Sequence, residues 1–523
     1  MRLLIALLLL TSAAFAADWP QWRGPNRDSV TSPSPELLNR LPEGGLKAVW
    51  EFKDVPGGWL GGWGSTVVAD GKVYVLSSAT TKEPIKQRIL HEDALKSWGW
   101  RADPLPMAIE NKVEAARLSK ARANLDSYTA RTWAQEWIKE NLPKKYRKYD
   151  LWVMEHISKG DRTLPPAVVR KLEPIVDREF PDHDALMKWF GQADIDKKYM
   201  KDIMRRVKRH NYHAVNRILC LDARSGREVW KSEFPGVGHH FPTSGTPTVH
   251  KGKIFLAGSG AKLYCIDAKG GEKIWERTLK VKPDQNLSSS VLIVDDLAIL
   301  LGGHLQAYDI DDGRLRWEAE GTDNRHSSPA LWKHADKSYV LCNTGRAVVC
   351  VDAMNGRPLW QVDGGGYTSP TIVGDILVTI GPTGKSALAA YDLSPAGPKQ
   401  RWQVMCRERG ASPLVYDGHV YVIGGRKTGG GKATCVNLKS GKVDWVQPIP
   451  DTEHASPVAA GGRIVNINWQ GQLEVILPSP EKYTLLAKAD LQLINCISPA
   501  IADGFLYARR KNSVVCFDLR AKK

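Results

Sequence analysis

The stretch Val349-Cys350-Val351-Asp352-Ala353-Met354-Asn355-Gly356-Arg357-Pro358-Leu359-Trp360 contains Asp, then Gly, then Trp at regular spacing. The same element recurs with Asp or Asn at its head, at Asp222–Gly226–Trp230, Asp267–Gly271–Trp275, Asp309–Gly313–Trp317, Asp392–Gly397–Trp402 and Asn437–Gly441–Trp445. Successive Trp residues lie about 42 to 45 positions apart, which is typical of one four-stranded blade per repeat in a β-propeller. In each repeat we expect the Gly to permit the positive φ of a hairpin loop and the Trp to wedge against the neighbouring blade.

A second signature, built on Ser or Thr, predicts the innermost strand of each blade. In several repeats the Ser is followed directly by Pro, as at Ser369-Pro370. The signature recurs at Ser65, Thr246, Ser290, Ser328, Ser369, Ser412, Ser456 and Ser498. It therefore marks two more blades than the Asp–Gly–Trp element does, those that begin at Ser456 and Ser498.

The two ends of the chain are predicted to complete one blade together. The last repeat ends in a third strand at residues 513–519 with no Trp after it, and the missing fourth strand is found at residues 46–52, around Trp50. Pairing them removes two exposed sheet edges. With a degenerate position near Leu486, the count reaches eight, so the predicted fold is all-β, an eight-bladed β-propeller over residues 17–80 and 215–523.

Residues 81–214 lack the repeat features and are predicted to be a helical insertion in the first blade. Apolar residues at helical spacing predict helices over residues 109–123, 126–141, 149–159, 166–180, 183–190 and 195–207. Asp126 and Asp194 are the expected N-caps, and Pro143 and Pro181 the expected breakers. Strand alternation places the insertion on the face that carries the blade-to-blade loops, either as a partial lid or packed on the rim.

Residues 1–16 are predicted to be a signal peptide, with an apolar run from Leu3 to Leu10 and Ala14-Phe15-Ala16 before the cleavage site. No cysteine follows that run, so we expect a periplasmic or secreted monomer with no lipid anchor and no membrane span. The net charge is +16, a value that in a cytosolic protein would suggest nucleic-acid binding. Because we expect this protein to be exported, we do not expect it to bind nucleic acid. About half of the excess positive charge lies in residues 82–209. It indicates either a solvated helical surface or a surface that attracts an anionic cell-surface component.

Five of the eight cysteines are predicted to be free and buried. These five share one repeat position, two residues before the Asp or Asn of the loop, and equivalent positions in different blades lie far apart: Cys220, Cys265, Cys350, Cys435 and Cys516. Cys342 could face Cys350 across one hairpin, and Cys406 and Cys496 are expected near the channel. No Cys-x-x-Cys-His occurs, which excludes covalent haem.

The candidate ligand-binding residues lie in the blade-to-blade loops, which converge on the mouth of the central channel. They are Trp63, His239, His240, Asn324, His326, Tyr367, Arg409, Glu453, His454 and Asn495, with Trp59, Asn286, Arg325, Arg407 and Cys496 in the same loops. Guanidinium, imidazole and indole groups suit an anionic or planar ligand. His326, His454 and one of His239 or His240 could approach one another, but no spacing enforces a metal site, and no Ser lies in a nucleophile elbow. No catalytic residue is assigned.

Residues 263–275, Leu-Tyr-Cys-Ile-Asp-Ala followed by Gly-Gly-Glu-Lys-Ile-Trp, and residues 349–360 resemble the tryptophan-docking repeats of the PQQ-like (quinoprotein) β-propeller family. The opening Asp18-Trp19-Pro20-Gln21-Trp22-Arg23-Gly24-Pro25 resembles the mature N-terminus of its exported members. The resemblance implies an exported propeller of the polyvinyl-alcohol dehydrogenase or BamB type. It leaves activity open, because that family contains both PQQ-dependent dehydrogenases and cofactor-free scaffolds.

Two functions follow from the resemblance. The first is a binding or scaffold protein that holds a polymer, peptide or protein partner at the channel mouth. The second is a PQQ- and Ca²⁺-dependent quinoprotein alcohol dehydrogenase, an oxidoreductase of the polyvinyl-alcohol dehydrogenase type. The sequence lacks the adjacent Cys-Cys pair of those dehydrogenases, and their calcium-binding trio is matched only by the nominees Glu453, Asn286, Asp323 and Asn324. It also lacks the lipid-attachment cysteine of BamB.

Overall fold

The computed structural model describes residues 18–125, 129–239, 241–282, 287–324, 326–345, 347–381, 387–406, 410–425, 431–450 and 454–522. Their contacts divide them into two compact units. The strand unit contains the described residues of 1–80, 214–382 and 386–523, and the helical unit contains residues 81–213 apart from 126–128. The predicted signal peptide at residues 1–16 lies outside the described residues.

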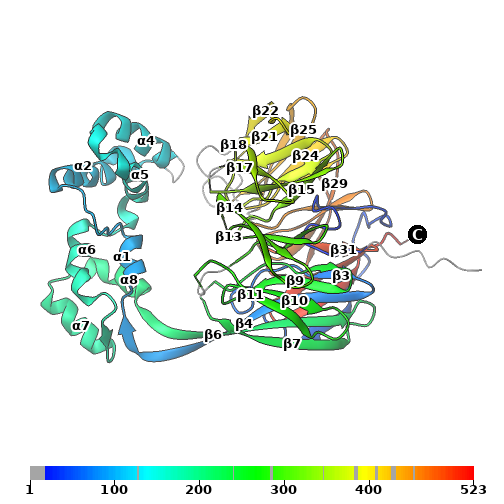
Figure 1. Ribbon diagram of the computed structural model, residues 1–523, viewed down its shortest axis with the longest axis horizontal. Helices are drawn as coiled ribbons and strands as arrows, with labels where there is room; N and C mark the ends of the chain where they lie inside the picture. Colours follow the sequence, from blue (N-terminus) through cyan, green and yellow to red (C-terminus); the bar gives the residue numbers. More distant parts are fainter. Residues whose placement is uncertain are drawn as a thin grey trace, which may run out of the picture. The chain divides into compact units, whose positions relative to one another are not determined.

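The strand unit is built from antiparallel sheets, most of them four-stranded (Figure 1). In chain order, the described strands form the following sheets: β3 (Val67–Ala69), β4 (Lys72–Ile89), β6 (Lys208–Asp222) and β7 (Glu228–Val237); β8 (Thr248–His250), β9 (Lys253–Gly258), β10 (Lys262–Asp267) and β11 (Lys273–Thr278); β12 (Leu292–Val294), β13 (Leu297–Asp309) and β14 (Leu315–Asn324); β15 (Ala330–His334), β16 (Lys337–Asn343), β17 (Ala347–Asp352) and β18 (Pro358–Asp363); β19 (Thr371–Val373), β20 (Ile376–Ile380), β21 (Ala387–Asp392) and β22 (Lys399–Met405); β23 (Leu414–Tyr416), β24 (His419–Gly424), β25 (Gly431–Asn437) and β26 (Val443–Ile449); β27 (Val458–Ala460), β28 (Arg463–Ile467), β29 (Gln472–Leu477) and β30 (Thr484–Asp490); and β31 (Ala500–Ala502), β32 (Phe505–Arg510), β33 (Ser513–Asp518) and β2 (Ala48–Lys53).

The first strands of these sheets contact one another in a closed cycle, as the inner strands of a β-propeller do. The contacts run in the order β3, β8, β12, β15, β19, β23, β27, β31 and back to β3. Strands from the two ends of the chain, β3 and β31, therefore lie side by side (Figure 1). The short strand β1 (Val30–Thr31) adds to β27 in parallel.

The predicted pairing of the chain ends is confirmed. Strand β2 pairs antiparallel with β33, with Trp50 opposite Cys516 and Phe52 opposite Val514. The outer strand of the last sheet thus comes from the beginning of the chain, so neither end leaves an unpaired edge at this position.

The repeated Trp residues join neighbouring sheets, as predicted. Each indole N–H donates to a carbonyl oxygen in the loop of the next sheet: Trp50 to Ala223, Trp230 to Ala268, Trp275 to Ile310, Trp317 to Ala353, Trp360 to Ser394, Trp402 to Leu438 and Trp445 to Ser479. The loop glycine lies directly against the ring, because a Cβ on Gly356 would come within 2.5 Å of Trp317 Cε3. The glycine therefore permits close approach as well as its φ of 73°.

The helical unit contains α1 (Glu92–Ser97), α2 (Met107–Arg117), α3 (Lys120–Ala123), α4 (Thr129–Asn141), α5 (Asp150–Lys159), α6 (Pro166–Leu172), α7 (His183–Gln192) and α8 (Lys197–Arg206), with 3₁₀ turns at Lys144–Tyr149, Gly160–Arg162 and Glu173–Ile175. Its apolar side chains form two clusters, one around Leu95, Leu172 and Phe190 and the other around Val113, Val153 and Ile157. No helix in the described residues is long and apolar enough to cross a membrane.

Three local predictions for this unit are wrong. The helix expected over residues 109–123 is divided, because Ser119 caps α3 by accepting a hydrogen bond from the N–H of Arg122. The helix expected to reach Phe180 ends earlier, and β5 (Glu179–Phe180) pairs with the end of β4 instead. Asp194 has a φ of 49° and is no cap, whereas Asp196 accepts from the N–H of Lys198 at the start of α8. The expected cap Asp126 lies outside the described residues.

The five cysteines at the repeat position are free thiols and buried, as predicted, and the other three form no disulfide either. Cys342 and Cys350 are not opposite each other, since Cys342 pairs in register with Val349 and Cys350 with Leu341. Burial raises the pKa of Cys220 to about 11 and the pKa values of Cys342 and Cys435 to about 12. These thiols are therefore poor nucleophiles at neutral pH.

Reaction of the native protein with a thiol reagent such as dithionitrobenzoate is expected to modify Cys496 first, because it is the only half-exposed cysteine and the other seven are buried. The remaining thiols should react only after denaturant is added. Counting the absorbance released before and after denaturation measures both classes. Rapid reaction of several thiols in the native state would contradict the packing described above.

Candidate functional site

The repeated Ser and Thr residues form a ring of hydrogen bonds between neighbouring inner strands, which we call the girdle. The backbone N–H of each girdle residue donates to the hydroxyl of the next at 2.8 to 3.0 Å: Ser65 to Thr246, Thr246 to Ser290, Ser290 to Ser328, Ser328 to Ser369, Ser369 to Ser412, Ser412 to Ser456 and Ser456 to Ser498. The closing link differs, since the hydroxyl of Ser65 donates to the carbonyl of Ser498. All of these residues are buried, and each lies two positions before the first residue of its inner strand, so the girdle serves structure at the start of the inner strands.

The N-terminal segment, residues 18–31, occupies one side of the girdle. It contacts inner-strand residues that follow the girdle: Trp19 bridges Val68, and the N–H of Val249 donates to Pro20. Val30 pairs with Ala459 in β27. Arg23 of the same segment contacts Thr371 in β19, which lies opposite β3 in the cycle of inner strands, so the segment crosses the ring.

Two buried arginines fix the N-terminal segment to the inner strands. Arg23 donates to the carbonyl of Pro413 at 2.7 Å and to the hydroxyl of Thr371 at 2.9 Å. Arg27 donates to the carbonyls of Ser290 and Val291. Burial lowers the pKa of Arg23 to about 10 and that of Arg27 to about 9, and their carbonyl partners compensate for lost water. On this side of the girdle, the strand ends are therefore covered by the chain itself.

The residues two positions before each girdle residue lie in the loops that lead into the inner strands, before the girdle in the chain, and we call them the mouth ring: Trp63, Ser244, Ser288, His326, Tyr367, Gly410, His454 and Cys496. Four predicted ligand residues belong to it, namely Trp63, His326, Tyr367 and His454. The predicted residues His240, Arg409 and Glu453, together with Asn286, Arg325 and Arg407, lie outside the described residues.

Three of the predicted residues come together in one arc of the mouth ring. The ring of His326 meets that of Tyr367 edge-on at 4.9 Å, and Tyr367 meets His454 edge-on at 6.4 Å. Tyr367 and His454 belong to sheets separated by one other sheet, whose mouth residue is Gly410. A Cβ on Gly410 would lie 1.8 Å from Nδ1 of His454, so only glycine leaves room for this arrangement. Tyr367 keeps 39% of its surface exposed.

The other aromatic residues gather at the loop before β3. Trp59 meets Trp63 edge-on at 5.1 Å and lies 5.1 Å from the ring of Phe241, which in turn neighbours His239 at 6.2 Å. Trp59 is 62% exposed and Phe241 39% exposed. Rings packed together yet open to solvent form a surface suited to contact with another molecule.

Two predicted residues brace the backbone instead. The side-chain amide of Asn324 donates to the carbonyls of Asn343 and Gly366, and its oxygen accepts from the N–H of His326. Asn495 donates to the carbonyl of Trp469 at 3.2 Å. Their contribution is to hold the loops of the mouth ring in place.

Two of the four calcium-site nominees, Asp323 and Asn324, lie in the described residues. Asp323 has its side chain 79% exposed and lies 3.4 Å from His304, and the amide of Asn324 is used in the loop contacts above. Among the residues that the structure describes, no group of three His, Cys, Asp or Glu side chains is placed to hold a metal ion. The other two nominees, Glu453 and Asn286, fall outside those residues.

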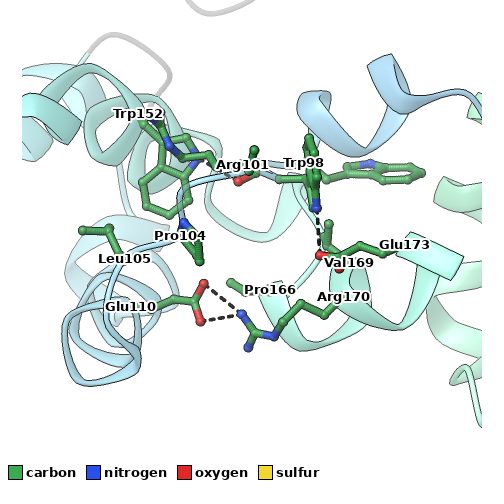
Figure 2. Close-up of a pocket in the computed structure, with 13 residues that line it drawn as sticks. Trp98, Arg101, Pro104, Leu105, Glu110, Trp152, Pro166, Val169, Arg170 and Glu173 are labelled. Carbon is green, nitrogen blue, oxygen red and sulfur yellow. Dashed lines mark hydrogen bonds and ion pairs between the residues drawn. The ribbon is translucent and has the colours of Figure 1, made fainter. Parts of the chain in front are cut away.

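Sequence reasoning missed a pocket of about 260 Å³ in the helical unit (Figure 2). Its lining includes three tryptophans, Trp98, Trp100 and Trp152, and four charged residues, Arg101, Glu110, Arg170 and Glu173. The available signal was the gathering of Trp residues in a segment without repeats. Their convergence was hidden because most come from the irregular connection between α1 and α2.

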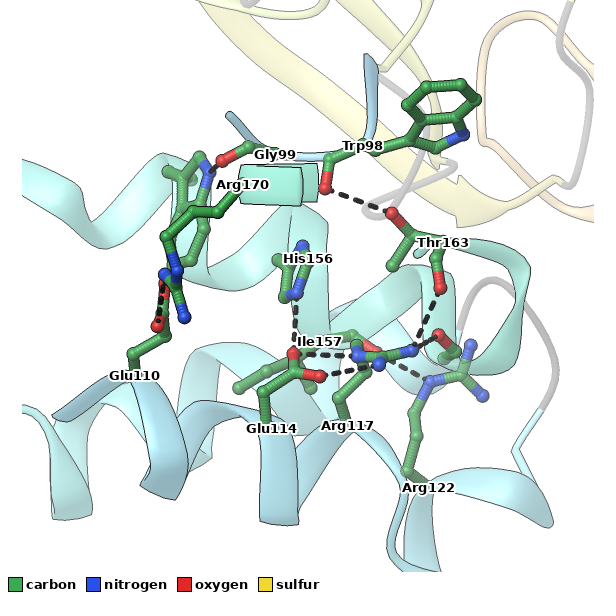
Figure 3. Close-up of polar contacts among 12 residues, drawn as sticks. Trp98, Gly99, Glu110, Glu114, Arg117, Arg122, His156, Ile157, Thr163 and Arg170 are labelled. Atoms are coloured by element: carbon green, nitrogen blue, oxygen red, sulfur yellow. Dashed lines mark hydrogen bonds and ion pairs between the residues drawn. The ribbon is translucent and has the colours of Figure 1, made fainter. Parts of the chain in front are cut away.

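A buried polar network supports one wall of this pocket (Figure 3). His156 stacks on Trp152 at 4.8 Å, and its Nε2 lies 2.7 Å from Glu114. Arg117 donates to both carboxylate oxygens of Glu114 and to the carbonyls of Gly160 and Thr163. Burial raises the pKa of Glu114, but hydrogen bonds from His156 and Arg117 outweigh it and hold the pKa below its usual value.

The match to a family model falls in the part of the sequence that forms the strand unit. A family model described as outer membrane protein assembly factor BamB matches residues 214–362 and 325–523. The chain has no significant match among curated proteins. Among solved structures, BamB from Moraxella catarrhalis is 17% identical, over 57% of this chain and 88% of that one, with a TM-score of 0.47. Quinohemoprotein alcohol dehydrogenase ADHIIG from Pseudomonas putida HK5 is 12% identical, over 60% and 73%, with a TM-score of 0.43.

Proposed function

This chain belongs to the PQQ-like repeat family whose matching model is described as outer membrane protein assembly factor BamB, and we propose that it is an exported binding scaffold. Its strand unit is an eight-bladed propeller over residues 17–80 and 215–523, and residues 81–214 are a helical insertion. Its partner is an extended segment of another protein, bound at the mouth ring. Export rests on the signal peptide expected at residues 1–16.

The observation that carries this proposal is the exposed aromatic surface at the mouth ring. Trp59, Phe241 and Tyr367 keep between 39% and 62% of their surfaces open, although each ring packs against another ring. Trp and Tyr dominate the energetics of protein interfaces, because they bury large area at low conformational cost. The opposite strand ends are covered by the N-terminal segment, so a partner can approach the inner strands from one side.

The proposal is tested with synthetic peptides about twelve residues long that carry aromatic residues at alternate positions, and with matched peptides in which Ser replaces each aromatic residue. We expect the aromatic peptides to bind, and Trp59→Ala or Tyr367→Ala to weaken binding by about tenfold, or ~1–2 kcal/mol. Fluorescence anisotropy measures the dissociation constants.

The matched control is Ile274→Ala, which removes an exposed apolar side chain, 43% accessible, from the outer strand β11. This variant should bind as the unchanged protein does. Equal binding of aromatic and Ser peptides, or binding that survives both Trp59→Ala and Tyr367→Ala, would place the interaction elsewhere.

The alternative function is a PQQ- and calcium-dependent alcohol dehydrogenase. We rank it second because the sequence lacks the adjacent Cys-Cys pair of those dehydrogenases, whereas the exposed aromatic rings favour a binding role. Adding PQQ and Ca²⁺ to the purified protein and measuring dye-linked oxidation of polyvinyl alcohol and short primary alcohols separates the two proposals. Activity that requires both additions would favour the enzyme.

A further inference from the structure

We propose that the pocket of the helical unit binds the ring of a neutral saccharide. The pocket lies between the two apolar clusters of this unit. Leu105, a member of the cluster around Val153, lines it on one side, and Val169, a member of the cluster around Leu172, lines it on the other. Both side chains are buried, which gives the pocket an apolar floor.

The walls of the pocket are flat and apolar. Trp100 and Trp152 are half-buried, and each has its indole N–H already used, by Glu173 Oε1 at 2.7 Å and by the carbonyl of Gly99 at 2.8 Å. These bonds fix the planes of the two rings, and both residues line the pocket. Figure 2 shows Trp152 on one side of it. A pyranose presents a face of C–H groups, which packs well on an indole ring held in this way.

The rim of the pocket supplies hydrogen-bonding groups of both kinds. Glu110 accepts from Nη1 of Arg170 at 2.8 and 3.1 Å, and the side chain of Arg170 is 50% exposed. Nη2 and Nε of Arg170 have no hydrogen-bond partner among the contacts found in the described helical unit. A sugar hydroxyl both donates and accepts, so a carboxylate beside a guanidinium can hold two neighbouring hydroxyls.

The charge of the lining favours an uncharged ligand. Two arginines, Arg101 and Arg170, are balanced by two glutamates, Glu110 and Glu173. An anionic ligand would meet both carboxylates, and a cationic ligand would meet both guanidinium groups. A neutral polyol satisfies both kinds of group without a net charge of its own. This inference is independent of the mouth ring, which belongs to the strand unit.

The test uses the full mature protein and a panel of tetrasaccharides in isothermal titration: cellotetraose, maltotetraose, mannotetraose and the tetramer of N-acetylglucosamine. Tetragalacturonate and tetraproline provide an anionic sugar and an apolar peptide for comparison. We expect at least one neutral tetrasaccharide to bind more tightly than either comparison ligand. Trp100→Leu should weaken that binding by about tenfold, since it removes one wall of the pocket.

Two further variants keep the result interpretable. Trp133→Leu alters a half-buried indole of α4 that does not line the pocket, and it should leave binding unchanged. Arg170→Lys lies at the rim and preserves the charge beside Glu110 but loses the planar fork, so it should weaken binding even if Trp100→Leu fails to fold. The proposal is overturned if no neutral tetrasaccharide binds, if tetragalacturonate or tetraproline binds as well, or if binding survives both pocket variants.

Discussion

Deletion of residues 18–53 is expected to prevent the strand unit from folding as a closed ring. The deletion removes β2 from its pairing with β33, removes Trp50 from the loop after β6, and removes Arg23 and Arg27 from the inner strands. Loss of one buried Trp alone costs about 3–5 kcal/mol, which is comparable with the whole stability of many domains at about 5–15 kcal/mol. We expect soluble aggregates, or a melting temperature lower by more than about 10 °C.

Calorimetry and light scattering measure this outcome. The matched control deletes Glu43 and Gly44 from the exposed turn in the same part of the chain, where no atom lies within 4 Å of a Cβ built on Gly44. That deletion should change the melting temperature little. If the longer deletion melted like the intact protein, closure by the chain ends would contribute nothing to stability.

Gly356→Ala is expected to destabilise the strand unit much more than Gly418→Ala. Both glycines have nearly the same backbone, with φ of 73° and 71°. An alanine at either position costs about 1–2 kcal/mol for the left-handed backbone. At Gly356 the new Cβ would also come within 2.5 Å of Trp317, which is buried and cannot move away, whereas nothing lies within 4 Å at Gly418.

The expected loss is therefore about 2–5 kcal/mol for Gly356→Ala and about 1–2 kcal/mol for Gly418→Ala. Urea unfolding followed by tryptophan fluorescence gives both free energies, and it reports directly on the ring that the alanine displaces. Equal losses for the two variants would show that backbone strain, and not contact with the Trp ring, explains why glycine occupies the repeated position.

The sequence predicted those parts of the fold that repeat. Trp50 could be assigned to the last sheet because the last repeat lacks its own fourth strand and Trp. Ser65 and Ser498 could be recognised because six other repeats carry Ser or Thr at the same position. The bonds of the girdle could not be predicted, since a Ser before Pro reveals nothing about its partner on another strand. The N-terminal segment crosses the ring through Arg23 and Arg27, which have no repeated pattern at all.

The candidate site was predictable only in part. Position in the repeat assigned Trp63, His326, Tyr367 and His454 to equivalent loops, and the structure brings the last three together. Position in the repeat did not distinguish residues of the mouth ring from residues that hold the backbone in place. Asn324 is of the second kind, because its side-chain amide donates to carbonyls in two other loops. The pocket around Trp100 was missed because irregular connections have no period from which convergence can be read.

The girdle also makes the propeller modular. Every joint along the chain from Ser65 to Ser498 uses the same bond, a backbone N–H of one inner strand and a hydroxyl of the next. Each blade therefore carries both the donor and the acceptor of these bonds. A copy inserted between two blades could form the same hydrogen bonds with both of its neighbours. The exception, at Ser498 and Ser65, falls where the first and last sheets meet. Duplication or loss of internal repeats can thus change the size of such a ring without the invention of a new interface.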